Sequence, residues 1–342
     1  MPLAPDIEGE ATIDQKVAFL SAMPGVSQVI ETHMAYVFLT ASSAFKLKKP
    51  VSFGYFDHRT LSGRATACSE EMRLNRALAG RVYIEVLPLT QADAQLTLGG
   101  EGRVVDWLVH MRRLPADRML DVVIAAHQGP SPTEVAALVA HLAHFYRQQQ
   151  TTPPPAGMYF AHLRREQAVN AANLTELAGH LPGIPVQRIV TDLSDRIEQA
   201  QAHIADREKA GLVIEGHGDL RPEHVCLTDP LVIFDRVETA REMRVVDVFD
   251  EVGYLAAECA MLGRPDLVET LLTGLRDAGF APPVAPLVTT YAMFRLVTRA
   301  RLSLDHLRDP DPRTPARWIG RTQRYLAEVQ RLSDAATAGD NA

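Results

Sequence analysis

The sequence predicts an α+β protein in which a small antiparallel β-sheet comes first and a mainly helical part follows. Runs rich in β-branched and aromatic residues, separated by short turns, dominate positions 1–112. Segments with apolar residues at helical spacing dominate positions 113–334, before a polar tail at 335–342. At this length the chain could hold one large two-lobed domain or two ordinary domains, with one short strand–turn–strand segment inside the helical part.

Composition narrows the class of protein. At 342 residues and 46% hydrophobic content the chain can bury a large core, and its net charge of -7 argues against nucleic acid as the main partner. The cysteines Cys68, Cys226 and Cys259 offer neither a disulfide framework nor a CxxC metal site, which fits the cytoplasm. No secretory leader and no apolar run of about 18 residues is present, so we expect no membrane insertion. The oligomeric state is not predicted.

The N-terminal elements follow from local signals. Thr12 and Gln15 have capping-box spacing and predict a short opening helix. Strand-like runs follow at 26–32, 35–40 and 44–49, which we expect to form an antiparallel sheet.

The third of these strands carries lysines on one face. Because strand side chains alternate, Ala44, Lys46 and Lys48 face one side, and Phe45 and Leu47 the other. Lysines also suit solvated edge strands, so the strand alone does not assign them a role.

A helix predicted from Thr60 to Ala79 contains Glu71, and two further strands follow at 82–90 and 103–111. The later chain shows helical periodicity over 131–149, 163–180, 185–209, 246–262, 264–278, 285–307 and 315–334.

The most informative stretch is Gly216-His217-Gly218-Asp219-Leu220-Arg221-Pro222-Glu223-His224, followed by an apolar strand that ends at Asp235. Phosphoryl transfer needs a carboxylate beside the attacking hydroxyl and another on magnesium. Asp219 and Asp235 have the spacing for these two roles, at one end of a predicted hairpin.

This order of parts resembles the aminoglycoside phosphotransferase and choline kinase family of the protein-kinase-like fold, whose loop reads H-G-D-x-x-x-x-N. His217, Gly218 and Asp219 match that loop, and His224 replaces its asparagine. The resemblance implies a strand lysine paired with a helix glutamate. We prefer Lys46 with Glu71, and Lys48 and Glu70 are the alternatives.

The resemblance further implies an ATP-dependent phosphotransferase that moves the γ-phosphoryl group to a hydroxyl of a small molecule. Asp219 would orient that hydroxyl, and Asp235 with His224 would hold Mg²⁺. His217 would hold the loop by hydrogen bonds, and Asp250, or otherwise Asp247, would brace it. Arg295 and Arg299 share one face of a predicted helix and could point together at an anion, although pairing with nearby carboxylates is the more common fate of such arginines. If they reach the cleft, they favour an acidic or phosphorylated acceptor over an aminoglycoside.

Two departures keep other functions open. The turn at 31–35, which would cover the phosphates, has no glycine, and no G-x-x-x-x-G-K-[ST] occurs, so we expect a stand-alone member without the fused P-loop domain. With His224, the missing glycines favour the alternative of a nucleotide-binding pseudokinase that acts through protein partners. A metal-dependent hydrolase using His217, Asp219 and His224 is the third hypothesis.

Overall fold

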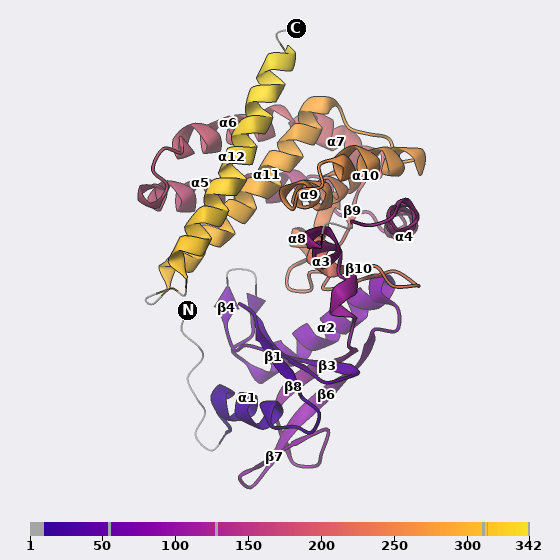
Figure 1. Ribbon diagram of the computed structural model, residues 1–342, viewed down its shortest axis with the longest axis vertical. Coiled ribbons are helices and arrows are strands. Elements are labelled where there is room, and N and C mark those ends of the chain that lie inside the picture. The colour runs from indigo at the N-terminus through magenta and orange to yellow at the C-terminus, as the bar shows by residue number, and fades with distance from the viewer. Residues whose placement is uncertain (1–9, 54–55, 127–128, 310–311, 313, 341–342) are drawn as a thin grey trace. The chain divides into compact units, whose positions relative to one another are not determined.

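The computed structural model describes residues 10–53, 56–126, 129–309, 312 and 314–340 (Figure 1). The chain divides into two compact units. The sheet unit is Met1–Val122 with Glu223–Arg241, and the helical unit is Val123–Pro222 with Glu242–Ala342. Within the described parts, no helix is both long and apolar enough to cross a lipid bilayer.

The sheet unit is built on a six-stranded antiparallel sheet in the order β1-β2-β3-β8-β6-β7. Its strands are β1 (Gln28–Glu31), β2 (Ala35–Leu39), β3 (Ser43–Lys48), β6 (Tyr83–Ala92), β7 (Gln95–Leu98) and β8 (Arg103–Arg112). The sequence analysis predicted five strands and missed β7, which pairs with the end of β6 across a tight turn. A two-stranded ribbon, β4 (Ser52–Phe53) with β5 (Phe56–Asp57), follows β3.

A different helix packs against each face of the sheet. α2 (Leu61–Ala79) contributes Cys68 and Met72 to a core that includes Ala44. α1 (Ile13–Ser21) contributes Leu20 to the opposite core, which includes Leu47. The predicted alternation along β3 is therefore confirmed, and it directs the lysines of β3 to the face that α2 covers.

The two helix starts that were predicted from capping residues are also confirmed. Thr12 forms a capping box with Gln15 at the start of α1. Thr60 caps α2 by accepting a hydrogen bond of 3.0 Å from the amide of Gly63. These side chains satisfy amides that the first helical turn leaves without partners, which is why both helices begin where they do.

The helical unit packs around one apolar core that includes Tyr159, Leu193, Val245 and Val297. Within it α11 and α12 lie side by side (Figure 1). The helices are α3 (Leu120–Ala125), α4 (Pro132–Gln149), α5 (Met158–Glu176), α6 (Val186–Gln199), α7 (Gln201–Lys209), α8 (Arg241–Arg244), α9 (Val248–Met261), α10 (Asp266–Asp277), α11 (Ala285–Leu304) and α12 (Pro315–Asp340). Three helices differ from the prediction. The helix predicted over 163–180 spans Met158–Glu176, the one predicted over 185–209 breaks at Ala200, and the last one continues past residue 334.

Two short strand pairs hold the H-G-D stretch and the segment after it. In the helical unit, β9 (Val213–Glu215) pairs with β12 (Val245–Asp247), so that loop 216–222 starts beside Arg244, where the amide of Gly216 donates a 2.7 Å hydrogen bond to the Arg244 carbonyl. In the sheet unit, β10 (Val225–Cys226) and β11 (Val232–Ile233) form the predicted hairpin that leads to Asp235. The α+β class with a small antiparallel sheet and a mainly helical part is confirmed.

A buried histidine in the helical unit predicts how the stability of the fold depends on pH. His162 on α5 is 7% exposed, and its Nδ1 has no hydrogen-bond partner among the described residues. Burial, assisted by Arg295 and Arg165, lowers the pKa of His162 to about 4. The unfolded chain takes up this proton near its ordinary pKa of about 6.5, whereas the folded chain stays neutral until pH about 4. The contribution is therefore complete above pH about 6.5 and is lost as pH falls to about 4.

We expect His162→Leu to reduce the acid destabilisation in this window by up to about 3 kcal/mol. Urea unfolding at pH 7, 6, 5 and 4.5 measures it as a change in slope against pH. His203→Leu, at an exposed position of α7, is the control and should leave the slope unchanged. An equal slope in wild type and His162→Leu would contradict the prediction.

Candidate active site

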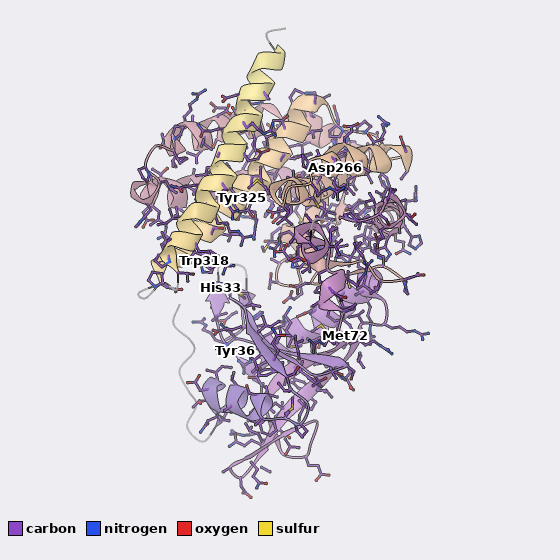
Figure 2. All side chains as sticks on the ribbon, in the orientation of Figure 1. His33, Tyr36, Met72, Asp266, Trp318 and Tyr325 are labelled. Carbon is purple, nitrogen blue, oxygen red and sulfur yellow. The ribbon has the colours of Figure 1, made fainter. Side chains whose placement is uncertain are left out.

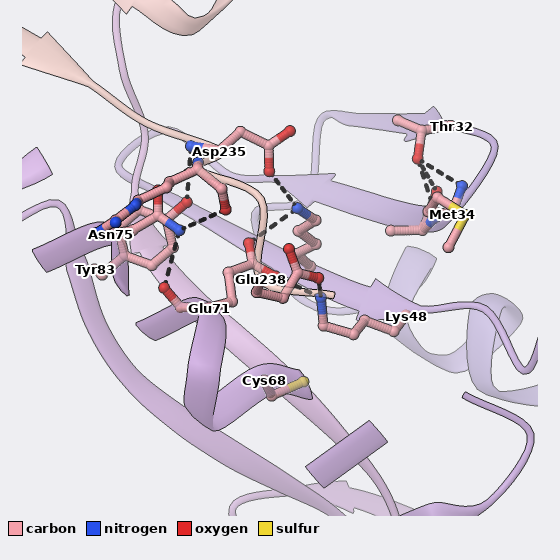
Figure 3. Close-up of polar contacts among 12 residues, drawn as sticks. Thr32, Met34, Lys48, Cys68, Glu71, Asn75, Tyr83, Asp235 and Glu238 are labelled. Atoms are coloured by element: carbon pink, nitrogen blue, oxygen red, sulfur yellow. Dashed lines mark hydrogen bonds and ion pairs between the residues drawn. The ribbon is translucent and has the colours of Figure 1, made fainter. Parts of the chain in front are cut away.

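In the sheet unit, lysines of β3 meet carboxylates from distant parts of the chain, and Figure 3 labels Lys48, Glu71, Asp235 and Glu238 of this cluster. Lys46 Nζ lies 2.9 Å from Glu71 Oε1 and 2.6 Å from Asp235 Oδ1. The three side chains come from β3, α2 and the segment after β11. The pair that we preferred from the sequence, Lys46 with Glu71, is thus present in the structure.

Lys48 extends this cluster. Its Nζ lies 2.6 Å from Glu71 Oε2 and 2.5 Å from Glu238 Oε1. Glu71 is fully buried and uses one oxygen for each lysine. The alternative helix carboxylate, Glu70, is instead half-exposed on the surface of α2 and pairs with Arg73. We call Asp235, Lys46, Glu71, Lys48 and Glu238 the five-charge network.

Opposite charges within the network stabilise the ionised forms of Lys46, Asp235 and Glu71. Burial opposes the charge on Lys46, but Asp235 and Glu71 outweigh it and raise the pKa of Lys46 well above its usual value. Burial would likewise raise the pKa of Asp235, yet Lys46 and His224 hold that pKa below its ordinary range. The pKa of Glu71 is also lowered, because both lysines overcome the cost of burial. At neutral pH the site therefore presents fixed charges.

Backbone contacts fix the segment that carries Asp235. The carbonyl oxygen of the Asn75 side chain accepts a 2.8 Å hydrogen bond from the amide of Arg236, and the hydroxyl of Tyr83 accepts one of 3.3 Å from the amide of Asp235. Asp235 adopts a φ of 63°, in the left-handed region that few residues other than glycine tolerate. Strain of this kind is typical of functional positions that their surroundings hold in place.

His224 lies near Asp235, as its predicted role requires. Its Nε2 is 3.7 Å from Asp235 Oδ2, and its carbonyl accepts a 3.0 Å hydrogen bond from the amide of Phe234. Among the residues that the structure describes, no three His, Cys, Asp or Glu side chains gather into a set that could hold a metal ion. The hydrolase hypothesis, which needs such a set, has no support from these residues.

The turn between β1 and β2 is held by its own threonine (Figure 3). Thr32 Oγ1 accepts hydrogen bonds from the amides of Met34, at 3.3 Å, and Ala35, at 2.9 Å. These amides are the groups that a glycine-rich turn would direct to a phosphate. In this conformation they are bonded within the turn instead.

In the helical unit, two glycines let loop 216–222 approach its support closely. A Cβ on Gly216 would lie 2.7 Å from both carboxylate oxygens of Glu251, and one on Gly218 would lie 2.8 Å from the carbonyl of Met243. Gly218 also has a φ of 90°, which glycine adopts without strain. Glu251 Oε1 accepts a hydrogen bond of 2.7 Å from the amide of Gly218. The loop therefore requires both glycines of the G-H-G-D sequence.

Asp219 is presented by this loop with defined neighbours. Its Oδ1 accepts a 3.2 Å hydrogen bond from the hydroxyl of Tyr254, and its Oδ2 lies 2.9 Å from Arg221 Nη2. The side chain of Asp219 is 33% exposed, whereas His217 is fully buried. His217 Nδ1 lies 3.3 Å from the amide nitrogen of Asp219, which is consistent with a loop-holding role.

The predicted bracing carboxylates both lie in the core of the helical unit. Asp250 binds Arg295 through both oxygens, at 2.8 and 2.5 Å, and Arg295 Nη1 also donates to the carbonyl of Gly218 at 3.3 Å. Asp250 therefore reaches the loop through Arg295. Asp247 instead caps α9 and pairs with Arg207. This separates two carboxylates that the sequence analysis left as alternatives.

Sequence reasoning missed several contacts. Glu251 and Tyr254 on α9 touch the loop, but neither belongs to a motif that the sequence analysis used. For Tyr254 the spacing was a usable signal. Asp250, Tyr254 and Glu258 recur every four residues and so share one face of α9. The partner of Glu238 had no such signal, since it depends on the three-dimensional approach of β3.

Comparison with protein-family models gave no match. An uncharacterized protein of Mycobacterium tuberculosis is 31% identical over 283 residues, which are 80% of this chain and 54% of the relative. An uncharacterized protein of Mycobacterium bovis matches with the same identity and coverage. The chain thus spans about half the length of these relatives, and neither relative's name states an activity.

Solved structures resemble the whole chain. The GDP complex of wild-type aminoglycoside 2′-phosphotransferase-IIIa matches with a TM-score of 0.54 and 15% identity, over 94% of this chain and 99% of that one. An ethanolamine kinase of Plasmodium vivax matches with a TM-score of 0.51 and 10% identity, over 96% of this chain and 92% of that one. At these identities the likeness establishes architecture. The chain therefore has the protein-kinase-like fold that aminoglycoside phosphotransferases and ethanolamine kinases share.

Proposed function

We propose that this protein is an ATP-dependent phosphotransferase that moves the γ-phosphoryl group to a hydroxyl of a small molecule. The observation that carries the proposal is the placement of Lys46 between Glu71 and Asp235, at 2.9 and 2.6 Å. A lysine oriented by a helix glutamate beside a metal-binding aspartate is the arrangement with which kinases hold nucleotide phosphates. These residues are far apart in sequence, so their meeting requires the fold.

Of the two lysines, Lys46 is the one we assign to the phosphates. Its side chain is 15% exposed, and its second carboxylate partner, Asp235, is 40% exposed. The side chain of Lys48 is 3% exposed and lies between Glu71 and Glu238. A phosphate can therefore reach Lys46 at lower cost, while Lys48 orients Glu71.

Asp219 is the residue we assign to the acceptor. As the acceptor oxygen forms its bond to the γ-phosphorus, the bond from that phosphorus to the β–γ bridging oxygen breaks, and ADP leaves with the electron pair. The hydroxyl proton passes to Asp219, whose carboxylate Tyr254 and Arg221 hold at 3.2 and 2.9 Å. Because the transition state of such transfers is loose, positioning by Asp219 contributes more than base strength.

The site can bind a divalent cation through one protein carboxylate, that of Asp235. Asp235 is ionised and 40% exposed, and Mg²⁺ is commonly held by one or two carboxylates together with substrate phosphates. His224 offers a nitrogen where an oxygen suits magnesium better. Magnesium bound here would supply charge neutralisation on the β- and γ-phosphates.

The comparisons add a second line of support. The structural neighbour aminoglycoside 2′-phosphotransferase-IIIa was solved with GDP, and the other is named as an ethanolamine kinase. Nucleotide binding and a hydroxyl acceptor are therefore within the range of this fold. The choice between ATP and GTP is open to direct assay.

A pseudokinase that binds nucleotide and acts through partners is the second candidate. It is favoured by the turn at Thr32, whose side chain occupies amides that would otherwise reach a phosphate, and by His224. The two functions differ in one result, because a pseudokinase binds ATP without hydrolysing or transferring its γ-phosphate.

We expect Lys46→Met to weaken ATP binding at least tenfold, since a charge-assisted contact to phosphate contributes about 1.5–3 kcal/mol. A thermal-shift titration with ATP and magnesium measures this, because ligand at 100 times its Kd adds about 2.7 kcal/mol of stability. Lys209→Met, at an exposed position of α7, is the matched control. If wild type shows no shift with ATP or GTP, the proposed function is wrong.

We expect Asp219→Asn to lower the rate of ATP turnover by about 10²- to 10⁴-fold, the usual range for a positioned proton acceptor. The affinity for ATP should stay within about twofold, because Asp219 is assigned to the hydroxyl. Slow ATP hydrolysis, with water as the acceptor, supplies the assay before the natural acceptor is known. Unchanged hydrolysis in this variant would remove Asp219 from the mechanism.

We expect wild type to bind ATP more tightly with Mn²⁺ than with Mg²⁺, because magnesium takes oxygen ligands in near-ideal octahedral geometry, which the imidazole of His224 does not supply. His224→Asn should then lower the Mg²⁺ concentration needed for half-maximal ATP binding several-fold, since the amide supplies an oxygen. Thermal shift at fixed ATP and varied metal reads this directly. Asp235→Asn is the control that should abolish the effect of both metals.

A further inference from the structure

Helices α9 and α11 present matched side chains one turn apart. On α9, Asp250, Tyr254 and Glu258 follow at four-residue spacing, and on α11 Arg295 and Arg299 do the same. The first arginine–carboxylate pair is hydrogen-bonded, because Arg295 donates two hydrogen bonds to Asp250. The second pair is an ion pair without a hydrogen bond, since Arg299 Nε lies 3.7 Å from Glu258 Oε1.

Arg299 lacks hydrogen bonds that a covered guanidinium needs. Its side chain is 14% exposed, and within the described residues its guanidinium makes no hydrogen bond. Glu258 also binds Tyr325, which lies on α12 (Figure 2) and whose hydroxyl donates to the Glu258 carboxylate, 3.0 and 3.1 Å from its two oxygens. A guanidinium carries five N–H donors, and leaving covered donors without acceptors costs free energy. Among the described residues, therefore, nothing accepts a hydrogen bond from the covered Nε–H of Arg299.

Arg299 also belongs to the surroundings of Asp219. Burial opposes its charge, but Tyr254 and Asp219 raise its pKa above the ordinary value, against the repulsion of Arg221. Tyr254 touches Asp219, and Arg295, one turn before Arg299, touches the carbonyl of Gly218. Arg221 therefore contacts the carboxylate that we assign to the acceptor hydroxyl, at 2.9 Å, and Arg299 follows one helical turn after the arginine that holds its loop.

We propose that Arg299, together with Arg221, binds an anionic group, a carboxylate or a phosphate, on the small molecule whose hydroxyl Asp219 orients. This inference rests on the proposed phosphotransferase function and names its acceptor class. The planar fork of arginine matches carboxylate and phosphate oxygens through two parallel hydrogen bonds. A cationic acceptor would instead meet two like charges, so the same residues select against aminoglycosides.

A matched set of hexoses tests the acceptor class. Wild type saturated with ADP and magnesium is titrated by calorimetry with glucose, glucosamine, gluconate and glucose 6-phosphate. We expect at least one anionic member to bind tenfold or more tightly than glucose, and glucosamine to bind no better than glucose. Gluconate and glucose 6-phosphate separate a carboxylate from a phosphate preference. Equal binding of all four, or preference for glucosamine, overturns the proposal.

Substitutions assign the effect to Arg299. Arg299→Met should lose at least tenfold in affinity for the preferred anion, and Arg299→Lys, which keeps the charge without the fork, should lose less. The ATP affinity and thermal unfolding of each variant show whether it is folded. If Arg299→Met does not fold, the anion affinity of Arg299→Lys tests the proposal. Arg308→Met, at a more exposed position after α11, is the control. Unchanged anion binding in Arg299→Met overturns the proposal about the acceptor. If wild type binds neither ATP nor GTP, the proposed function itself is wrong.

Discussion

The sheet unit depends on one constraint, the sharing of the buried carboxylate of Glu71 between two lysines. A buried ion is costly unless charged partners and hydrogen bonds surround it. Glu71 meets this condition with one oxygen for each lysine, and Asp235 and Glu238 supply the remaining charge. Because β3 places Lys46 and Lys48 on the same face, carboxylates three residues apart on one returning segment can meet both. The network therefore fixes strand, helix and returning segment together.

In the helical unit, a buried carboxylate is neutralised by an arginine. Hydrogen bonds from side chains of α9 and α11 hold the backbone of loop 216–222. Glu251 holds the amide of Gly218, and Arg295 holds its carbonyl while it neutralises Asp250. A planar guanidinium can serve both acceptors at once, which an ammonium group does less well. Asp219 is consequently presented by a backbone that is held on both sides.

The sequence was sufficient where the signal is local. Capping residues placed α1 and α2, alternation placed the lysines of β3, and the H-G-D spacing located the loop. It was insufficient where a contact depends on packing. Nothing near Glu238 indicates that Lys48 will reach it, and the weak turn before β7 hid a sixth strand. The grouping of residues 223–241 with the sheet also follows from tertiary contacts, which no periodicity encodes.

The two lysines show how burial divides similar residues between structure and chemistry. Both have two carboxylate partners, so contacts alone do not distinguish them. The exposure of their side chains distinguishes them. Lys48 is buried, whereas Lys46 is partly exposed and its partner Asp235 is more exposed still. A polyphosphate that approached Lys46 would replace one anion with another, so the lysine would keep its charge and its contact with Glu71. The Asp235 carboxylate released by that exchange would be free to bind a cation, which couples nucleotide and metal through a single ammonium group.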